Sequence, residues 1–338
     1  YGPVTSIKEM FTRSEEFGDR VAVVEKIKKQ DAVYTVKEFH DKVRQLGTAL
    51  YELGLGGKHV SIVSENSYNW IVTFFAIVCG GGVCVPIDKE LPDKDISMLI
   101  TKGDAEAVFV SRTYIDTAKL HLTNDDRCKN VFLMSGKCDD DKFMTIEKLA
   151  EIGREELKKG NRDFLDATPQ KDDMAAILFT SGTTGTNKGV MLSQNAILSD
   201  LSSVIPYMDF GKKTVGVLPP HHTFGSSVML IGHMMIGSEI YISGGLRYVA
   251  KELKEQEPEH LVIVPLYLET FYRRIMANLK EKKKEKLVAR MIKISNGSVS
   301  VKMLMAQGYM AFREQNISSR QAAVRPRGPM TAISREIT

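Results

Sequence analysis

The sequence predicts an α/β protein with largely parallel sheets, and two observations support this prediction. Short β-rich runs alternate along the chain with segments of helical periodicity, which is the pattern of strand–helix–strand units. Several of the runs are continuously apolar, as strands buried on both faces of a parallel sheet are. The chain has 338 residues, 43% of them hydrophobic, which suffices for a large buried core.

The predicted strands are Val21–Glu25, His59–Val63, Val83–Ile87, Ala107–Val110, Asn130–Met134, Ala175–Thr180, Thr214–Leu218, Glu239–Ile242 and Leu261–Val264. The predicted helices between them are Val36–Leu53, Tyr68–Cys79, Gln194–Val204, Phe224–Ile236 and Leu266–Leu279. Local signals mark several helix ends: Asn66 precedes the second helix, Gly54 follows the first, and Pro92-Asp93 opens a further helix.

A polar stretch, 161–173, is the best internal boundary of the chain. It predicts a first α/β subdomain over 1–160 and a second over 174–296. The runs on both sides keep the same strand–helix alternation, and no internal repeat is evident.

The composition excludes several classes of protein. A net charge of +4 is too small to indicate a nucleic-acid partner, and the balance of residues excludes disordered and collagen-like chains. The cysteines lack C-x-x-C spacing and nearby histidines, so we expect reduced thiols of a cytosolic protein rather than a zinc site. They are Cys79, Cys84, Cys128 and Cys138.

Two segments raise the alternative of a membrane partner. The apolar stretch Trp70–Ile87 has about the length of a span, but Gly80–Gly82 interrupts it and Pro86 closes it, which favours a buried helix, a turn and a buried strand. The charged run Lys280–Lys286 is typical of a solvated helix face, and a peripheral membrane contact stays open as the alternative. The chain begins with Tyr1 and shows no signal peptide, so we expect a trimmed N-terminus.

The most informative segment follows the predicted strand that ends at Phe179. It is dense in hydroxyl groups and glycine and contains one cation: Thr180-Ser181-Gly182-Thr183-Thr184-Gly185-Thr186-Asn187-Lys188-Gly189. Glycine lets the backbone approach an anion closely, and N–H and hydroxyl groups donate to phosphate oxygens. The loop is not a Walker P-loop, because Asn187 takes the place of the second glycine and Gly189 follows Lys188. We therefore predict a different polyphosphate-binding loop, with a plain surface turn as the alternative.

The segment TSGTTGTNKGVMLS resembles the phosphate loop of the adenylate-forming superfamily, which contains acyl-CoA synthetases, luciferases and peptide-synthetase adenylation domains. The family usually has proline where this chain has Asn187. The resemblance implies the N-terminal part of the family's large domain, with stacked α/β subdomains. It also implies that ATP contacts Thr180, Ser181, Gly182, Thr183, Thr184, Gly185 and Lys188, with Lys188 and Thr184 catalytic and Thr180 able to approach Mg²⁺.

A second block, Val217-Leu-Pro-Pro-His-His-Thr-Phe-Gly, resembles the family segment beside the acyl pocket. By this resemblance His222 faces the acyl-adenylate, and Phe224 and Gly225 shape the pocket. The alternative is that the histidines only cap the following helix. Blocks that fit the long-chain branch of the acyl-CoA synthetases are 60–70, 85–92 and 261–275.

The resemblance is lost after Asn296. The family's Tyr-Gly-x-Thr-Glu block is not found, and Gln307-Gly-Tyr309 is only a faint echo of it. Residues 297–338 contain 1 Lys, 5 Arg and no Asp. We expect an atypical, non-native tail and an incomplete chain without the family's small C-terminal domain; a genuine divergent tail is the alternative.

The resemblance implies ATP-dependent activation of a carboxylic acid, in particular a fatty acid, to an acyl-adenylate and then to acyl-CoA. The substrates would be the acid, ATP with Mg²⁺, and coenzyme A, and the location the cytoplasm. One alternative is a catalytically inactive nucleotide-binding fragment. Another is a related ligase, either an aryl-CoA ligase or an amino-acid adenylation domain.

Overall fold

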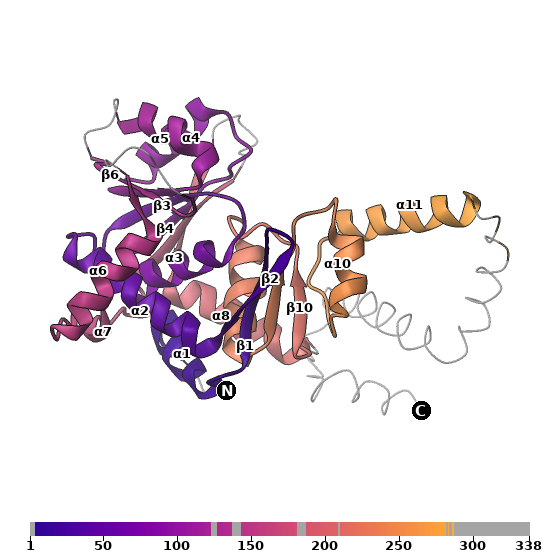
Figure 1. Ribbon diagram of the computed structural model, residues 1–338, viewed down its shortest axis with the longest axis horizontal. Helices are drawn as coiled ribbons and strands as arrows, with labels where there is room; N and C mark the ends of the chain where they lie inside the picture. Colours follow the sequence, from indigo (N-terminus) through magenta and orange to yellow (C-terminus); the bar gives the residue numbers. More distant parts are fainter. Residues whose placement is uncertain are drawn as a thin grey trace, which may run out of the picture. The chain divides into compact units, whose positions relative to one another are not determined.

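The computed structural model describes residues 4–122, 127–136, 143–180, 187–208 and 210–281, together with 283 and 286 (Figure 1). The chain divides into two units. The first comprises Tyr1–Ile205 and Phe210–Val262, and the second Pro206–Asp209 and Ile263–Thr338. Both sheets belong to the first unit, and the second contains the helix α11 (Pro265–Glu281).

The larger sheet of the first unit has seven strands and is almost entirely parallel. Every neighbouring pair is parallel except the last, which is antiparallel. The strand order is β7 (Met144–Thr145), β6 (Asn130–Leu133), β5 (Ala107–Val110), β3 (His59–Val63), β4 (Val83–Pro86), β8 (Met174–Thr180) and β9 (Lys188–Ser193). The predicted α/β class with parallel sheets is therefore confirmed.

Helices cover both faces of this sheet. Helices α4 (Asp93–Lys102) and α5 (Ile115–Leu122) lie on one face, and α2 (Val36–Glu52), α3 (Tyr68–Cys79) and α6 (Ile146–Lys158) lie on the other (Figure 1). The chain leaves β3 toward α3 and leaves β4 toward α4, so the crossovers of two adjacent strands turn to opposite faces. Such a switch point opens a crevice at the carboxyl ends of the strands, where ligands of α/β sheets bind.

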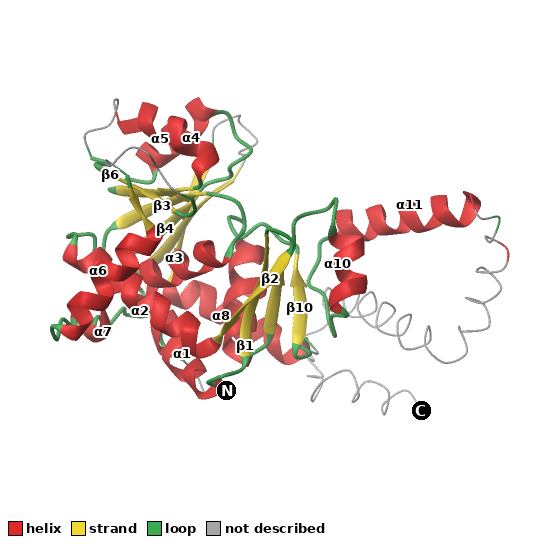
Figure 2. Ribbon diagram, in the orientation of Figure 1, coloured by secondary structure: helices red, strands yellow, loops and turns green. Residues whose placement is uncertain are grey.

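The smaller sheet has four strands in the order β10 (Lys213–Gly216), β11 (Glu239–Ile242), β1 (Val21–Ile27) and β2 (Gln30–Thr35). The first three are parallel and β2 pairs antiparallel with β1. Helix α3 contacts strands of both sheets. Figure 2 also labels the helices α1 (Ile7–Arg13), α7 (Asp163–Asp166), α8 (Gln194–Val204) and α10 (Val249–Gln256). The remaining elements are η1 (Ser14–Phe17), η2 (Arg112–Tyr114), η3 (Ile205–Tyr207), η4 (Gly225–Gly232) and α9 (His233–Ile236).

The strand pairings cross the boundary that the polar stretch 161–173 predicts. Strand β8 pairs with β4, and β11 pairs with β1, so each sheet takes strands from both sides of the stretch. The Lys8 ammonium also donates to carbonyls of this stretch, which holds it against α1. The structure thus differs from a division into 1–160 and 174–296, because strand pairing far apart in sequence sets the layers. Residues 297–338 lie outside the described part of the chain.

Among the other sequence predictions, one helix is confirmed, one strand is wrong and three strands were missed. The predicted strand Leu261–Val264 is wrong, since pairing with β10 stops at a single bridge from Thr214 to His260. Strands β2, β7 and β9 were not predicted. Helix α3 has the predicted bounds, and its cap is Ser67, whose hydroxyl accepts from the Trp70 N–H at 3.1 Å.

The described part of the chain contains no helix long and apolar enough to cross a membrane. The stretch proposed as an alternative span is instead α3 followed by β4, as predicted. The cysteines Cys79, Cys84 and Cys128 are buried, and Cys138 lies outside the described residues.

Candidate active site

The predicted phosphate loop connects the two strands of an antiparallel hairpin. Strand β8 ends at Thr180, β9 begins at Lys188, and these two residues are paired across the hairpin. Both are exposed. Ser181, Gly182, Thr183, Thr184 and Gly185 lie outside the described residues. Thr180 and Lys188 therefore bracket the loop from opposite sides of its base.

The cation at the loop base is available to a ligand. The Lys188 side chain is exposed, and it forms no ion pair within the described part of the chain. A second cation, Lys102 at the end of α4, donates from Nζ to the carbonyl of Asn187. Asn187 stands where the family usually has proline, so this contact anchors the loop base that a proline ring would otherwise stiffen.

The second predicted block lies against the carboxyl ends of β3 and β4. After β3, the Asn66 amide donates to the carbonyl of Leu218 at 3.3 Å. After β4, the Asp88 carboxylate lies 3.7 Å from Nε2 of His221. Because β4 and β8 are parallel neighbours, Thr180 ends at the same edge of the sheet. The two predicted blocks are therefore both placed at the edge where the crossovers diverge.

Of the two adjacent histidines, His221 is the one that lies in this crevice, beside Asp88. Its side chain is 17% exposed, and its Nε2 atom is buried without a hydrogen-bond partner in the described chain. Burial lowers the pKa of His221 to about 4, and the Asp88 carboxylate opposes this shift. The ring is thus neutral at pH 7. Sequence reasoning chose its neighbour, because a His-His pair by itself carries no signal that distinguishes the two.

The three predicted substrate residues have different environments. His222 and Phe224 are exposed, Phe224 to 40%. Gly225 is buried, and a Cβ at this position would lie 2.0 Å from the carbonyl oxygen of Pro219. Glycine is therefore required here for a close approach of two backbone segments.

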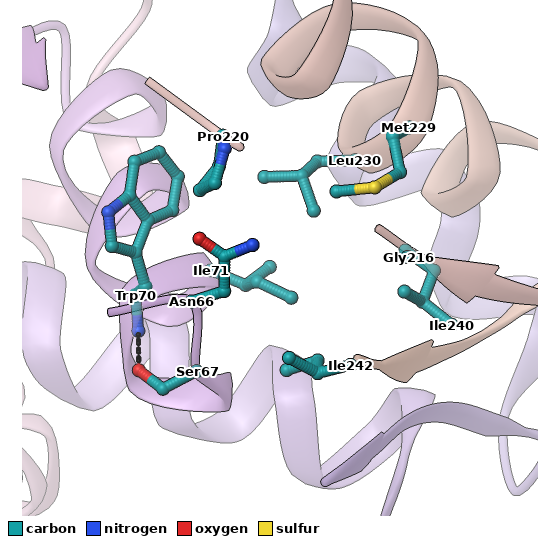
Figure 3. A pocket seen from close by; sticks show the side chains of 10 residues that line it. All are labelled: Asn66, Ser67, Trp70, Ile71, Gly216, Pro220, Met229, Leu230, Ile240 and Ile242. Carbon is teal, nitrogen blue, oxygen red and sulfur yellow. Dashed lines mark hydrogen bonds between the residues drawn. The ribbon is translucent and has the colours of Figure 1, made fainter. Parts of the chain in front are cut away.

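A small apolar pocket lies beside this block (Figure 3). It has room for only about 10 Å³, the size of one water molecule at most. Its lining is mostly apolar, with the Asn66 amide and the Ser67 hydroxyl as polar groups; the other lining residues are Trp70, Ile71, Gly216, Pro220, Met229, Leu230, Ile240 and Ile242. His222, Phe224 and Gly225 are not among its lining residues, and sequence reasoning did not select those that are.

No resident metal centre is formed by the described residues, in which no three His, Cys, Asp or Glu side chains are grouped as ligands. Thr180, which was predicted to approach Mg²⁺, offers one hydroxyl oxygen at the end of β8. A divalent cation at this edge would thus need most of its ligands from a bound polyphosphate and water.

Comparison with known proteins finds ligases of carboxylic acids among the relatives of this chain. The chain is 24% identical over 320 residues to a chloroplastic long-chain-fatty-acid acyl-carrier-protein ligase of Arabidopsis thaliana, which covers 89% of this chain and 44% of the relative. It is 29% identical over 228 residues to 4-hydroxybutyrate–CoA ligase 2 of Metallosphaera sedula, covering 66% of this chain and 40% of the relative. The chain thus spans less than half the length of these curated relatives.

Solved structures show the same fold. A long-chain-fatty-acid–CoA ligase of Archaeoglobus fulgidus superposes with a TM-score of 0.68 at 18% identity, over 82% of this chain and 55% of that one. The N-terminal domain of FACL13 from Mycobacterium tuberculosis gives a TM-score of 0.63 at 20% identity, over 79% and 65% of the two chains. The model of the family of AMP-binding enzymes matches residues 10–316, so the match continues past Asn296, where the resemblance was expected to end. The phosphate-loop hairpin, the switch-point crevice and this match, which extends over most of the sequence, agree: the chain belongs to the AMP-binding enzyme family.

Proposed function

We propose that this chain supplies the nucleotide-gripping part of an enzyme that activates a carboxylic acid with ATP and transfers the acyl group to coenzyme A. The observation that carries the proposal is the β8–β9 hairpin, which sets Thr180 and Lys188 on either side of a glycine- and hydroxyl-rich loop. Family membership supports the same reaction class.

The loop would hold the β- and γ-phosphates of ATP, with Mg²⁺ entering as part of the nucleotide complex. The residues proposed for this role are Thr180, Ser181, Gly182, Thr183, Thr184, Gly185 and Lys188. Lys188 places a compact positive charge where negative charge accumulates on the leaving pyrophosphate, and Thr184 adds a hydroxyl donor. Catalysis of this kind depends mostly on positioning and charge stabilisation.

The reaction proceeds in two balanced steps. A carboxylate oxygen bonds to the α-phosphorus while the bond to the pyrophosphate oxygen breaks, giving acyl-adenylate and pyrophosphate. The thiol sulfur of coenzyme A then bonds to the acyl carbon, its proton is released, and AMP leaves. Neutral His221 beside Asp88 is available at the crevice to orient a polar group of the acid, a role proposed on sequence grounds for His222.

The acid is proposed to be a fatty acid, because the walls of the pocket beside the His-His block are apolar apart from the Asn66 amide and the Ser67 hydroxyl (Figure 3); at about 10 Å³ this pocket has to widen before it admits a hydrocarbon chain. A hydrocarbon body gains free energy by leaving water for such a surface. The relatives named above are ligases for a long-chain fatty acid and for 4-hydroxybutyrate, so their printed substrates are both aliphatic acids.

The experiment that tests the proposal is binding of a fluorescent ATP analogue to the chain, in the presence of Mg²⁺, for wild type and Lys188→Ala. We expect Lys188→Ala to weaken binding tenfold or more, about 1.4 kcal/mol, because it removes a charge–phosphate contact. The matched control is Lys171→Ala, another exposed lysine, which should bind as wild type does. Equal affinities of the two variants would contradict the role of the loop.

A second assay separates the proposed enzyme from an inactive nucleotide-binding chain. Hydroxylamine traps an acyl-adenylate as a hydroxamate, so the chain is incubated with Mg²⁺, ATP and acids of increasing hydrocarbon length. Hydroxamate that requires ATP supports acid activation. Nucleotide binding without any hydroxamate would assign this chain a binding role alone.

A further inference from the structure

Two histidines far apart in the sequence form a buried chain of hydrogen bonds in the first unit. Nε2 of His233 lies 2.7 Å from Nε2 of His260, and the two rings are nearly parallel, with an interplanar angle of 9°. His233 is fully buried, and Phe210 packs edge-on against both rings. The pair joins the start of α9 to the segment that runs beside β10.

The outer partners of the two rings determine where their protons are. Nδ1 of His233 lies 3.0 Å from the carbonyl oxygen of Val228, which can only accept, so this nitrogen carries a proton. Nδ1 of His260 receives the N–H of Gly211 at 3.0 Å, so this nitrogen is the acceptor. In the neutral pair the remaining proton is then on Nε2 of His260, which donates to Nε2 of His233.

The pair acts on the helix that borders the apolar pocket. Residues Gly225–Gly232 form η4, a π-helix, and all of them are buried. A π-helix of this length is rare and needs support from outside its own backbone. The carbonyl of Val228 lies inside η4, five residues before His233, and the His233 ring is bonded to it.

We propose that the His233–His260 pair is a latch that holds η4 in its π register and thereby keeps Met229 and Leu230 in the pocket. Both side chains line the pocket, and the fit is tight: a Cβ on Gly216 would lie 3.2 Å from Sδ of Met229. A change of η4 toward α-helical register rotates side chains around the helix axis. Release of the latch therefore changes the space inside the pocket.

The geometry makes the latch sensitive to acid. Every ring nitrogen of the neutral pair is already a donor or an acceptor, so an added proton would place two donors face to face. Burial and, to a lesser extent, the neighbouring His260 lower the pKa of His233 to about 4, while hydrogen bonding to the backbone of Val228 and Met229 opposes this shift. A proton on either ring thus breaks one hydrogen bond of the chain.

The charged groups on the surrounding elements are already engaged or belong to exposed residues. On the strands, Lys213 is paired with Glu239 at 3.2 Å. Beside His260, the Glu259 carboxylate accepts from the Lys212 N–H at 2.7 Å. Helix α9 also packs against α1 and η1, whose charged residues are Lys8, Glu9, Arg13, Glu15 and Glu16. None of these carboxylates contributes to the pKa of His233.

The first test is nitrogen NMR of the histidine side chains in the full chain at pH 7.5. We expect a proton on Nδ1 of His233 and on Nε2 of His260, with Nε2 of His233 free of a proton. Any other pair of tautomers, or a protonated His233 at pH 7.5, would overturn the latch.

The second test is hydrogen exchange of the amides of residues 225–232, corrected for intrinsic rates, at pH 7.5 and pH 5. We expect exchange in wild type to be tenfold or more faster at pH 5, and in His233→Phe to be fast at both values. Strand β5 (Ala107–Val110) serves as an internal reference that stays protected, which separates local release from unfolding. Loss of protection in β5 to the same extent would overturn a local latch.

The matched control is His59→Gln, which removes a histidine whose Nδ1 contacts the carbonyl of Gly103 elsewhere in the same unit. It should keep the wild-type dependence on pH, and loss of that dependence would contradict the assignment. His260→Gln retains a donor toward His233 and should keep more protection at pH 7.5 than His233→Phe. That the pocket receives the acid rests on the proposed function; these measurements use no nucleotide or acid, so failure of the latch leaves the ATP-binding result standing.

Discussion

The β8–β9 hairpin and the segment from Val217 to Ile236 both contribute to one edge of the first unit, but different kinds of contact hold them in place. The hairpin is local: its two strands pair with each other, and Thr180 and Lys188 at its base are exposed. The segment is largely buried, apart from the exposed residues 222–224, and depends on distant partners, from Asn66 and Asp88 at one end to His260 at the other.

The difference shows how each region tolerates change. Side chains at an exposed loop base can be replaced with little loss of packing, so their removal should affect ligand binding more than stability. Where the segment is buried, side chains fill space or satisfy buried polar groups, so substitution there should affect stability first. Each of the following predictions tests one side of this contrast.

The largest effect is expected for Gly225→Ala in the buried segment. The new Cβ would lie 2.0 Å from the Pro219 carbonyl oxygen, so the backbone must move. We expect a loss of about 3 kcal/mol or more in the free energy of unfolding, measured by urea denaturation. The control is Gly232→Ala, where the nearest atom would be the side-chain Cδ2 of Leu201 at 3.3 Å and the change should be within about 1 kcal/mol. Similar losses for the two variants would contradict the requirement for glycine at position 225.

The next largest effect is the loss of stability in acid that His221, one of the two adjacent histidines, should cause. The folded pKa of His221 is about 4, below the ordinary value of 6.5, so the unfolded state binds the proton first as pH falls. Stability is therefore lost between pH 6.5 and pH 4, by about 2 kcal/mol from pH 7 to pH 5 for this group. His221→Gln should remove that part of the loss in urea denaturation at the two pH values. The exposed neighbour offers the control: His222→Gln should keep most of the loss, because burial rather than His222 is the largest cause of the lowered pKa of His221, and the reverse pattern would contradict the environments described here.

The smallest effect is expected at the hairpin. Lys102→Ala removes the bond from the ammonium to the Asn187 carbonyl at the loop base. We expect the affinity for the ATP analogue to fall about fivefold, on the order of 1 kcal/mol, with the free energy of unfolding nearly unchanged. Lys94→Ala on the same helix is the control and should alter neither quantity. A loss of stability without a loss of affinity would show that the contact supports the fold rather than the loop.

Much of the fold could be predicted from the sequence because it depends on local patterns. The continuous apolar runs at His59–Val63 and Ala107–Val110 are strands with the predicted bounds, and α3 occupies Tyr68–Cys79 as predicted. The hydroxyl- and glycine-rich loop could be predicted for the same reason, because the groups that would bind phosphate belong to consecutive residues. Only its place in an antiparallel hairpin, with β9 as the second strand, was not foreseen.

The sequence by itself determined the α/β class, the order of the main strands and helices, and the candidate phosphate loop. The tertiary structure decided which strands pair across the stretch 161–173, which histidine lies in the crevice beside Asp88, and that Gly225–Gly232 forms the π-helix η4. The physical reason is the range of the interactions. Apolar periodicity and turn chemistry act between neighbours in the sequence, whereas burial of His221 and the bond between His233 and His260 exist only once distant segments have packed together.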